Sequence, residues 1–224
     1  MNPLRHDFIR SCISHSGYTP PSDSKAYLDI GCGGGIFTES VARLRDTRKV
    51  VGIDPSSQVI TVAQRHARKD PTLSVDGKLE YLNQSIEDLA LPERSDEQYD
   101  VVTLFEVIEH IDKPSIFLKK CMPFVKPGGW LIGSTIARTW TSWLTTKVVA
   151  EDVLSLVPQG THDWKKYINA DELEAFFARQ EGYGANRGIK FSGCVYVPGF
   201  GWNTIGGSEE WGNYFFGLRR NPDP

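Results

Sequence analysis

The stretch Tyr27-Leu-Asp-Ile-Gly-Cys-Gly-Gly-Gly-Ile-Phe37 decides the fold of this chain. Its apolar start, residues 27–30, suits a buried strand, and the periodicity of residues 36–45 predicts a helix directly after the glycines. Glycine at positions 31, 33 and 35 permits a tight turn and a close approach of the backbone to a ligand. A strand, a glycine-rich turn and a helix in this order are typical of a nucleotide-like binding site, where we expect that any Cβ would collide with the ligand.

The spacing of the glycines distinguishes two kinds of ligand. The dinucleotide fingerprint G-x-G-x-x-G, begun at Gly31, requires glycine or alanine at position 36, where this chain has isoleucine. The chain has instead Asp29-x-Gly31-x-Gly33-x-Gly35, which resembles motif I of the class I S-adenosylmethionine-dependent methyltransferases. The spacing therefore disfavours an NAD-dependent dehydrogenase.

A second predicted strand, Lys49 to Ile53, ends at Asp54. In α/β nucleotide folds a carboxylate at about this distance from the glycines binds the ribose hydroxyls. An ionised carboxylate can accept hydrogen bonds from both hydroxyls of the ribose. The alternative is that Asp54 only caps the helix that follows it.

Composition describes an ordinary globular chain. The 224 residues are enough for one α/β domain, 40% of them are hydrophobic and 24% are charged. The net charge of −3 shows no footprint for nucleic acid, and no run of 18 apolar residues could span a bilayer. The four cysteines lack C-x-x-C spacing and the density of a disulfide scaffold, which favours free thiols in a reducing compartment.

Strand and helix patterns alternate along the chain. A short helix is predicted near residues 4–13, and further strands at residues 78–82, 99–105 and 130–135 are separated by helical segments. This alternation predicts a Rossmann-like, doubly wound, mostly parallel sheet in one domain over residues 1–224. The segments 188–197 and 211–218 look like the antiparallel strand pair that completes a seven-stranded methyltransferase sheet, with a glycine-rich loop at 199–207 between them.

The strand Tyr99 to Phe105 ends in Glu106-Val-Ile-Glu109-His110. Ligands of open α/β sheets bind at the carboxyl ends of the strands, so these side chains are expected at the mouth of the cofactor site. If the segment forms one helical turn, Glu106, Glu109 and His110 share a face and could bind a divalent cation, Mg²⁺ or Zn²⁺. The alternative is that the three act without a metal. Further upstream, Glu87 or Asp88 is placed to meet an adenine ring or to belong to a solvated turn.

An amphipathic segment follows the fifth strand, over residues 139–158 of an insertion that extends to 164. Its tryptophans, Trp140 and Trp143, share one predicted helical face. Such a face suits a membrane interface, a lid over an apolar substrate or the core. His162, in the cluster after it, is a candidate general base or a histidine that holds a turn.

Five motifs narrow the resemblance to the ubiquinone-biosynthesis O-methyltransferase family. They are the start Met1-Asn-Pro-Leu-Arg5, the glycine turn, Phe105 to His110, Lys126-Pro-Gly-Gly129 and Val157-Pro-Gln-Gly-Thr-His-Asp163. The last motif, together with E-x-x-E-H, is the most specific, and the match covers nearly the whole chain. The resemblance implies methylation of ring hydroxyls on polyprenylated catechol-type and demethylubiquinol intermediates, with S-adenosylmethionine and a divalent cation.

The resemblance also assigns residues. It implies cofactor binding by Arg5, Gly31, Asp54 and Phe105, alongside the glycine-turn positions Gly33 and Gly35. It implies metal binding by Glu106, Glu109 and His110, and catalysis by Glu109 and His162. A cation bound to both catechol oxygens would lower the pKa of the attacking oxygen, which otherwise lies near 10 as in tyrosine.

The resemblance further implies a cellular setting. It predicts a peripheral protein on the matrix face of the mitochondrial inner membrane, or on the cytoplasmic face of the membrane in a bacterium. Residues 139–158 would contact anionic lipid, and other ubiquinone-biosynthesis proteins would be partners. Relatives carry a segment before the N-P-L-R motif, so we expect a shortened form. Two alternatives are a non-catalytic, cofactor-binding scaffold of a biosynthetic complex and a metal-independent small-molecule methyltransferase.

Overall fold

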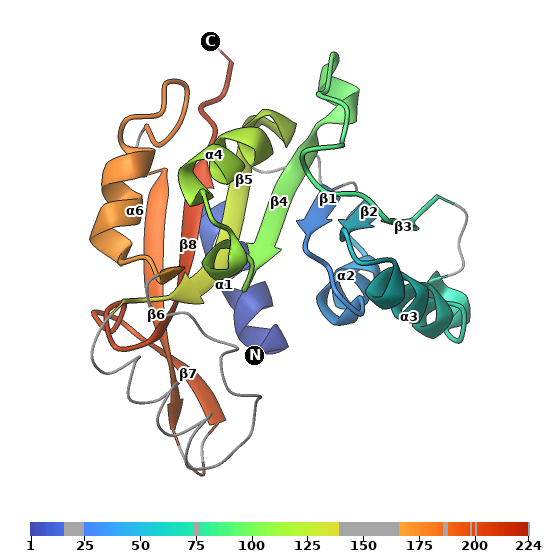
Figure 1. Ribbon diagram of the computed structural model, residues 1–224, viewed down its shortest axis with the longest axis horizontal. Coiled ribbons are helices and arrows are strands. Elements are labelled where there is room, and N and C mark those ends of the chain that lie inside the picture. Colours follow the sequence, from blue (N-terminus) through green and yellow to red (C-terminus); the bar gives the residue numbers. More distant parts are fainter. Residues whose placement is uncertain are drawn as a thin grey trace.

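An eight-stranded sheet forms the centre of the described chain, with helices on both of its faces (Figure 1). The computed structural model describes residues 1–15, 25–73, 77–138, 166–185, 188–197, 199 and 201–223. The strands are β1 Lys25–Ile30, β2 Thr47–Ile53, β3 Leu79–Leu82, β4 Tyr99–Phe105, β5 Val125–Ile136, β6 Ile189–Val197, β7 Gly201–Ile205 and β8 Asn213–Arg219. The α-helices are α1 Asn2–His15, α2 Ile36–Ala42, α3 Ser57–Ala67, α4 Pro114–Cys121 and α6 Ala170–Phe177. Short 3-10 turns are η1 Pro71–Leu73, η2 Ser95–Glu97, η3 Ile108–His110 and η4 Met122–Phe124.

The strand order is β3-β2-β1-β4-β5-β8-β6-β7. Strands β1 to β5 pair in parallel, and the order reverses between β1 and β4. This is the doubly wound arrangement that the alternating pattern predicted, and it places a crevice at the carboxyl ends of β1 and β4. The predicted Rossmann-like fold is confirmed.

The C-terminal part of the sheet has one strand more than predicted. Strand β8 runs antiparallel between β5 and β6, which confirms the predicted pair. The segment predicted as a glycine-rich loop contains β7, which pairs antiparallel with β6 and makes the sheet eight-stranded. Gly199 and Gly201 both have positive φ angles, +85° and +77°, and turn the chain back on itself directly after β6. The glycines therefore form a hairpin, and the prediction of seven strands was wrong.

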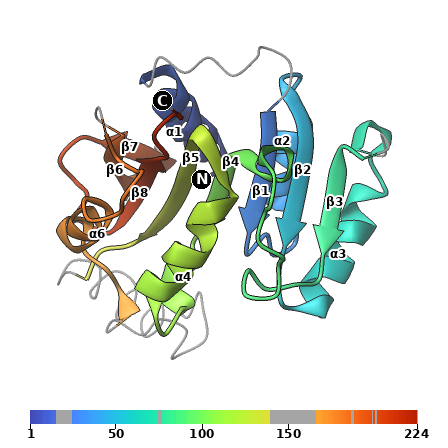
Figure 2. The same cartoon turned by 90° about the horizontal axis from the view of Figure 1, so that it is seen from above.

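Side chains along the strands point alternately to the two faces of the sheet, and a hydrophobic core packs on each face. Leu28 and Val102 point to one side and pack with residues of α4 and α6. Their neighbours Tyr27 and Val101 point to the other side and pack with residues of α1 and α2. Because both faces are covered, β4 is buried from its second residue to its last. Figure 2 shows α1 and α4 on opposite sides of the sheet.

The segment Lys126–Gly129, which precedes the strand predicted at residues 130–135, lies within β5. The pairing of β5 with β4 jumps from Tyr99–Val125 to Val101–Trp130, so the segment is an irregularity in the strand. A Cβ at Gly129 would stand 2.7 Å from the Asp100 carbonyl oxygen. Gly129 therefore lets the two strands approach each other.

Helix α1 confirms the predicted N-terminal helix. Phe8 stacks on Phe215 of β8 with ring centroids 5.3 Å apart, and Cys12 is fully buried. This packing fixes the helix on the sheet and holds Arg5, one turn before Phe8, near the end of β4. All four cysteines of the chain are free and buried, as expected.

Within the described ranges, no helix is both long and apolar enough to cross a membrane. The predicted amphipathic insertion at 139–164 lies outside the described residues.

Candidate functional site

A cavity of about 280 Å³ opens where β1, β2 and β4 end. Its walls come from the ends of three parallel strands, the segment after β3 and the start of α4. The lining residues are Ile30, Gly31, Ile53, Asp54, Pro55, Gln84, Ser85, Ile86, Glu87, Glu106, Val107, His110, Ile111 and Phe117. This is the crevice at the topological switch point, where α/β sheets bind their ligands.

The glycine turn is shaped mainly by the protein itself. A Cβ at Gly31 would stand 2.6 Å from Val107 Cγ2, and one at Gly35 would stand 2.2 Å from the Tyr81 hydroxyl. A Cβ at Gly33 would meet no atom of the described residues within 4 Å. The protein's own side chains therefore already exclude a Cβ at Gly31 and Gly35, and the prediction that a ligand excludes them stays a prediction. Of the three glycines of the turn with positive φ, Gly33 alone has open space beside it among the described residues.

Replacing Gly35 by alanine is expected to destabilise the protein by about 1–3 kcal/mol, because the new Cβ clashes with Tyr81 in a left-handed backbone. Gly33→Ala should cost less, since it meets backbone strain without a clash. Urea unfolding of both variants measures the difference. Adding Tyr81→Phe to Gly35→Ala removes the clashing hydroxyl and should restore part of the loss. Equal destabilisation by the two alanines would contradict this account.

Asp54 links the glycine turn to the start of α3. Its Oδ2 accepts a hydrogen bond from the Gly33 amide at 3.1 Å, and its Oδ1 accepts one from the Ser56 amide at 2.9 Å. Ser56 is the N-cap of α3, so Asp54 is not the cap itself. A carboxylate has about four acceptor positions, so two remain for other donors. Asp54 lines the cavity and is placed to accept hydrogen bonds from a diol.

Asp29, the acid of the motif, is buried beneath the turn. Its carboxylate accepts hydrogen bonds from Thr38 of α2 at 2.6 Å and Thr103 of β4 at 2.8 Å. Burial raises the pKa of Asp29 to about 6, although the two threonine hydroxyls and the Arg5 cation oppose that shift. Asp29 thus ties the first strand to its following helix and to β4, which fixes the glycine turn.

Arg5 lies across the end of β4. Its Nη2 is 2.9 Å from Glu106 Oε1, and its guanidinium carbon lies 4.9 Å from the centre of the Phe105 ring. The Arg5 Nε is buried and has no hydrogen-bond partner among the residues that the structure describes. Phe105 is buried and packs edge-on against Phe37 of α2. Phe105 therefore does not line the cavity, and it supports the arginine that holds a cavity-lining carboxylate.

Glu106 ends β4 in an unusual conformation. It is the one non-glycine residue with positive φ, +60°, in the part of the chain that the structure describes. Such a backbone costs about 1 kcal/mol or more and tends to mark functional sites. The 3-10 turn η3 begins only at Ile108. The predicted helical turn through Glu106, Glu109 and His110 is therefore wrong, because helical spacing requires helical φ angles at its first residue.

The three predicted metal ligands also differ in environment. Glu106 is half exposed and paired with Arg5, Glu109 is buried, and His110 is exposed at the cavity. Among the residues described, no three or more His, Cys, Asp or Glu side chains are grouped to hold a metal ion. The arrangement of these three residues does not fit the predicted cation site.

Glu109 faces the interior. Its Oε2 accepts a hydrogen bond from Thr135 Oγ1 at 3.0 Å, and only 5% of the residue is exposed. Burial raises the pKa of Glu109 to about 7, and the nearby Glu106 carboxylate adds to that rise. Glu109 does not line the cavity, so its predicted catalytic role stays a prediction.

The segment after β3 contributes more residues to the cavity than the sequence indicated. Glu87 lines the cavity, whereas Asp88 turns away and accepts a hydrogen bond from the Ser85 hydroxyl at 2.7 Å. Sequence reasoning did not identify Gln84, Val107 or Ile111 as cavity residues. In the sequence, the only indication that these residues line a cavity was their position next to the ends of predicted strands. His162 and the segment 139–158 lie outside the described residues.

The fold and this crevice define a class I methyltransferase, and the comparisons agree. A family model described as "Methyltransferase domain" matches residues 28–133. The structure of the plantazolicin methyltransferase BpumL, in complex with a pentazolic desmethylPZN analog and SAH, has a TM-score of 0.67. The match covers 97% of this chain and 83% of that chain at 16% sequence identity, so it shows the fold alone.

Two relatives identify the family within that class. The mitochondrial ubiquinone biosynthesis O-methyltransferase of Candida albicans is 43% identical over 202 residues, 88% of this chain and 58% of that protein. The ubiquinone biosynthesis O-methyltransferase of Nitrobacter winogradskyi is 38% identical over 88% of this chain and 72% of that protein. The chain belongs to the ubiquinone biosynthesis O-methyltransferase family. It spans about three fifths of the length of the fungal relatives it matches.

Proposed function

We propose that this chain transfers a methyl group from S-adenosylmethionine to a ring hydroxyl of a polyprenylated phenol in ubiquinone biosynthesis. The observation that carries the proposal is Asp54, which lines the crevice beside an open glycine turn and keeps two acceptor positions. Family membership supports the reaction class, and the SAH in the BpumL structure supports the cofactor.

The residues present fit that cofactor. Asp54 would accept the two ribose hydroxyls, and the open space beside Gly33 would admit the chain that carries the sulfur. Glu87 and Ile86 would face the adenine. The Arg5 cation would attract the carboxylate of the cofactor's methionine part. When bound there, S-adenosylmethionine supplies an electrophilic methyl carbon.

The protein must present a phenol oxygen to that carbon and remove its proton. Alignment of the reacting atoms contributes roughly 7–11 kcal/mol at best. His110 lines the cavity, and an imidazole is the side chain that most often transfers protons in catalysis. His110 is better placed than Glu109 to accept the phenol proton at Nδ1 or Nε2, because Glu109 does not line the cavity. His162 stays the other predicted base.

A divalent cation has no step in this proposal. Glu106, Glu109 and His110 are not arranged around a common point in the structure. Whether magnesium or zinc assists the reaction is tested by assaying turnover before and after chelation.

The predicted setting supports the same substrate class. The fungal relatives are named mitochondrial, which supports a mitochondrial location for this chain. We extend the proposal to peripheral attachment at the inner membrane through residues 139–158, and to association with other proteins of the pathway. Both would bring the chain to a substrate whose prenyl tail lies in lipid.

The test is calorimetric titration with S-adenosylhomocysteine, followed by a methylation assay on a farnesyl-substituted catechol. A Kd in the micromolar range and a product heavier by one methylene are expected. Absence of binding would contradict the proposal. Binding without turnover would favour the scaffold alternative. As a control, Asp96→Ala, an exposed carboxylate remote from the cavity, should change neither result.

A further inference from the structure

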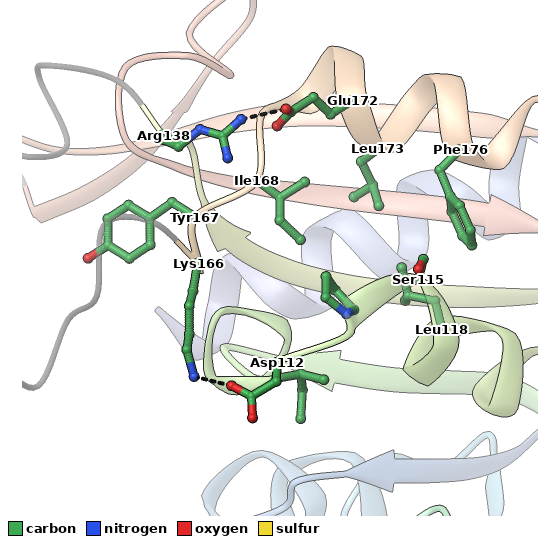
Figure 3. Close-up of a pocket in the computed structure, with 12 residues that line it drawn as sticks. Asp112, Ser115, Leu118, Arg138, Lys166, Tyr167, Ile168, Glu172, Leu173 and Phe176 are labelled. Carbon is green, nitrogen blue, oxygen red and sulfur yellow. Dashed lines mark hydrogen bonds and ion pairs between the residues drawn. The ribbon is translucent and has the colours of Figure 1, made fainter.

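A second, apolar groove lies between α4 and α6 (Figure 3). It has a volume of about 310 Å³ and adjoins the cofactor cavity at Ile111, which lines both. Leu173 and Phe176 project from α6 toward Ser115 and Leu118 on α4. No residue of this groove was assigned a function from the sequence.

Two ion pairs border the groove, and they indicate the charge of its ligand. Lys166 Nζ lies 2.6 Å from Asp112 Oδ1, and Arg138 Nη2 lies 2.5 Å from Glu172 Oε1 (Figure 3). Each cation is therefore balanced by a carboxylate within the protein. A charged ligand would have to compete with these partners, and the charges of the described border residues, Asp112, Arg138, Lys166 and Glu172, sum to zero and favour neither an anion nor a cation.

The floor of the groove is hydrocarbon. It is formed by Ile111, Pro114, Leu118, Ile168, Leu173 and Phe176. Leu118 and Leu173 are almost completely buried, and the others are partly exposed to the groove. A neutral border over an apolar floor selects an uncharged hydrocarbon chain.

We infer that this groove holds the first isoprene units of the substrate's tail while the phenol ring lies at the mouth of the cofactor cavity, beside the bound cofactor. This inference rests on the proposed function, because the tail reaches the groove only if the ring enters the adjoining cavity. Ile111 separates the two compartments and contacts both. The groove would thereby orient the ring, since a tail fixed at one end limits which hydroxyl can reach the methyl carbon.

The test compares binding of catechol with binding of a farnesyl-substituted catechol by calorimetry, without cofactor. The tail should strengthen binding of the wild-type chain by about tenfold or more. Ser115→Trp places a large side chain in the groove from an exposed position, and it should remove most of that gain. Phe176→Ala, which shortens the opposite wall, should weaken only the farnesylated ligand.

The matched control is Ile116→Trp. Ile116 is the next residue of α4, is 52% exposed and does not line the groove, so the tail should keep its full gain in this variant. Circular dichroism checks that each variant is folded. The inference would be overturned if the farnesyl tail strengthened binding to Ser115→Trp as much as to the wild type, or if it did not strengthen binding to the wild type. If the tail strengthened binding to the wild type but not to Ser115→Trp, and the wild type methylated neither ligand, the result would support the groove and contradict the proposed activity.

Discussion

Replacing Asp54 by alanine is expected to weaken binding of S-adenosylhomocysteine by about 100-fold or more. Two hydrogen bonds to a charged acceptor are worth roughly 1.5–3 kcal/mol each, and both would be lost with the carboxylate. The variant also loses the bonds from the amides of Gly33 and Ser56, so the glycine turn loosens at the same time. Calorimetric titration at neutral pH measures the change in Kd.

A conservative variant separates the two effects of Asp54. Asp54→Asn keeps one acceptor oxygen and the size of the side chain, so it should hold the turn better than alanine and lose less affinity. Circular dichroism and urea unfolding establish whether each variant is folded. Affinity of Asp54→Ala within a few-fold of the wild type would refute the assignment of Asp54 to the ribose hydroxyls.

Replacing Glu109 by glutamine is expected to stabilise the protein at pH 8 by on the order of 3 kcal/mol. Burial raises the pKa of Glu109 from 4.5 in the unfolded chain to about 7 in the folded protein. The folded state therefore binds more protons than the unfolded state between these values, and stability falls as pH rises through that window. The glutamine side chain has no charge to bury, and it can still accept the hydrogen bond from Thr135.

The measurement is urea unfolding of both proteins from pH 4.5 to pH 8. The two should have similar stability at pH 4.5 and diverge up to about pH 7. Asp29 titrates in an overlapping range, since its pKa is raised to about 6, and its contribution cancels in the difference between the two proteins. Glu174→Gln, an exposed change on α6, should show no pH-dependent gain. A difference that stays constant with pH would contradict the raised pKa of Glu109.

Much of the fold could be predicted because strand burial is visible in local sequence. Tyr99 to Phe105 is nearly continuous in apolar residues, as a strand covered on both faces must be, and it forms β4 at those bounds. The prediction was wrong at β7, because the glycines around Trp202 that suggest a loop serve as the turns of a hairpin. Pairing with β6, which no local pattern indicates, made that segment a strand.

The site was predicted less completely. Asp54 was identified because its distance from the glycine turn is set by one strand–helix–strand unit. The predicted grouping of Glu106, Glu109 and His110 on one helical face was wrong, since it assumed helical angles that Glu106 does not adopt. The groove between α4 and α6 brings Leu118 and Arg138, which are 20 positions apart, together with residues of α6, so sequence spacing carried no sign of it.

The sequence by itself determined the order of the strands and helices other than β7, the glycine turn and the position of Asp54, because these depend on near neighbours along the chain. Only the tertiary structure decided that Val107 and Tyr81 leave no room for a Cβ at Gly31 and Gly35. It also decided that Glu109 is buried while His110 faces the cavity. These features depend on which distant segments pack together, and burial and pKa are properties of that packing rather than of residue type.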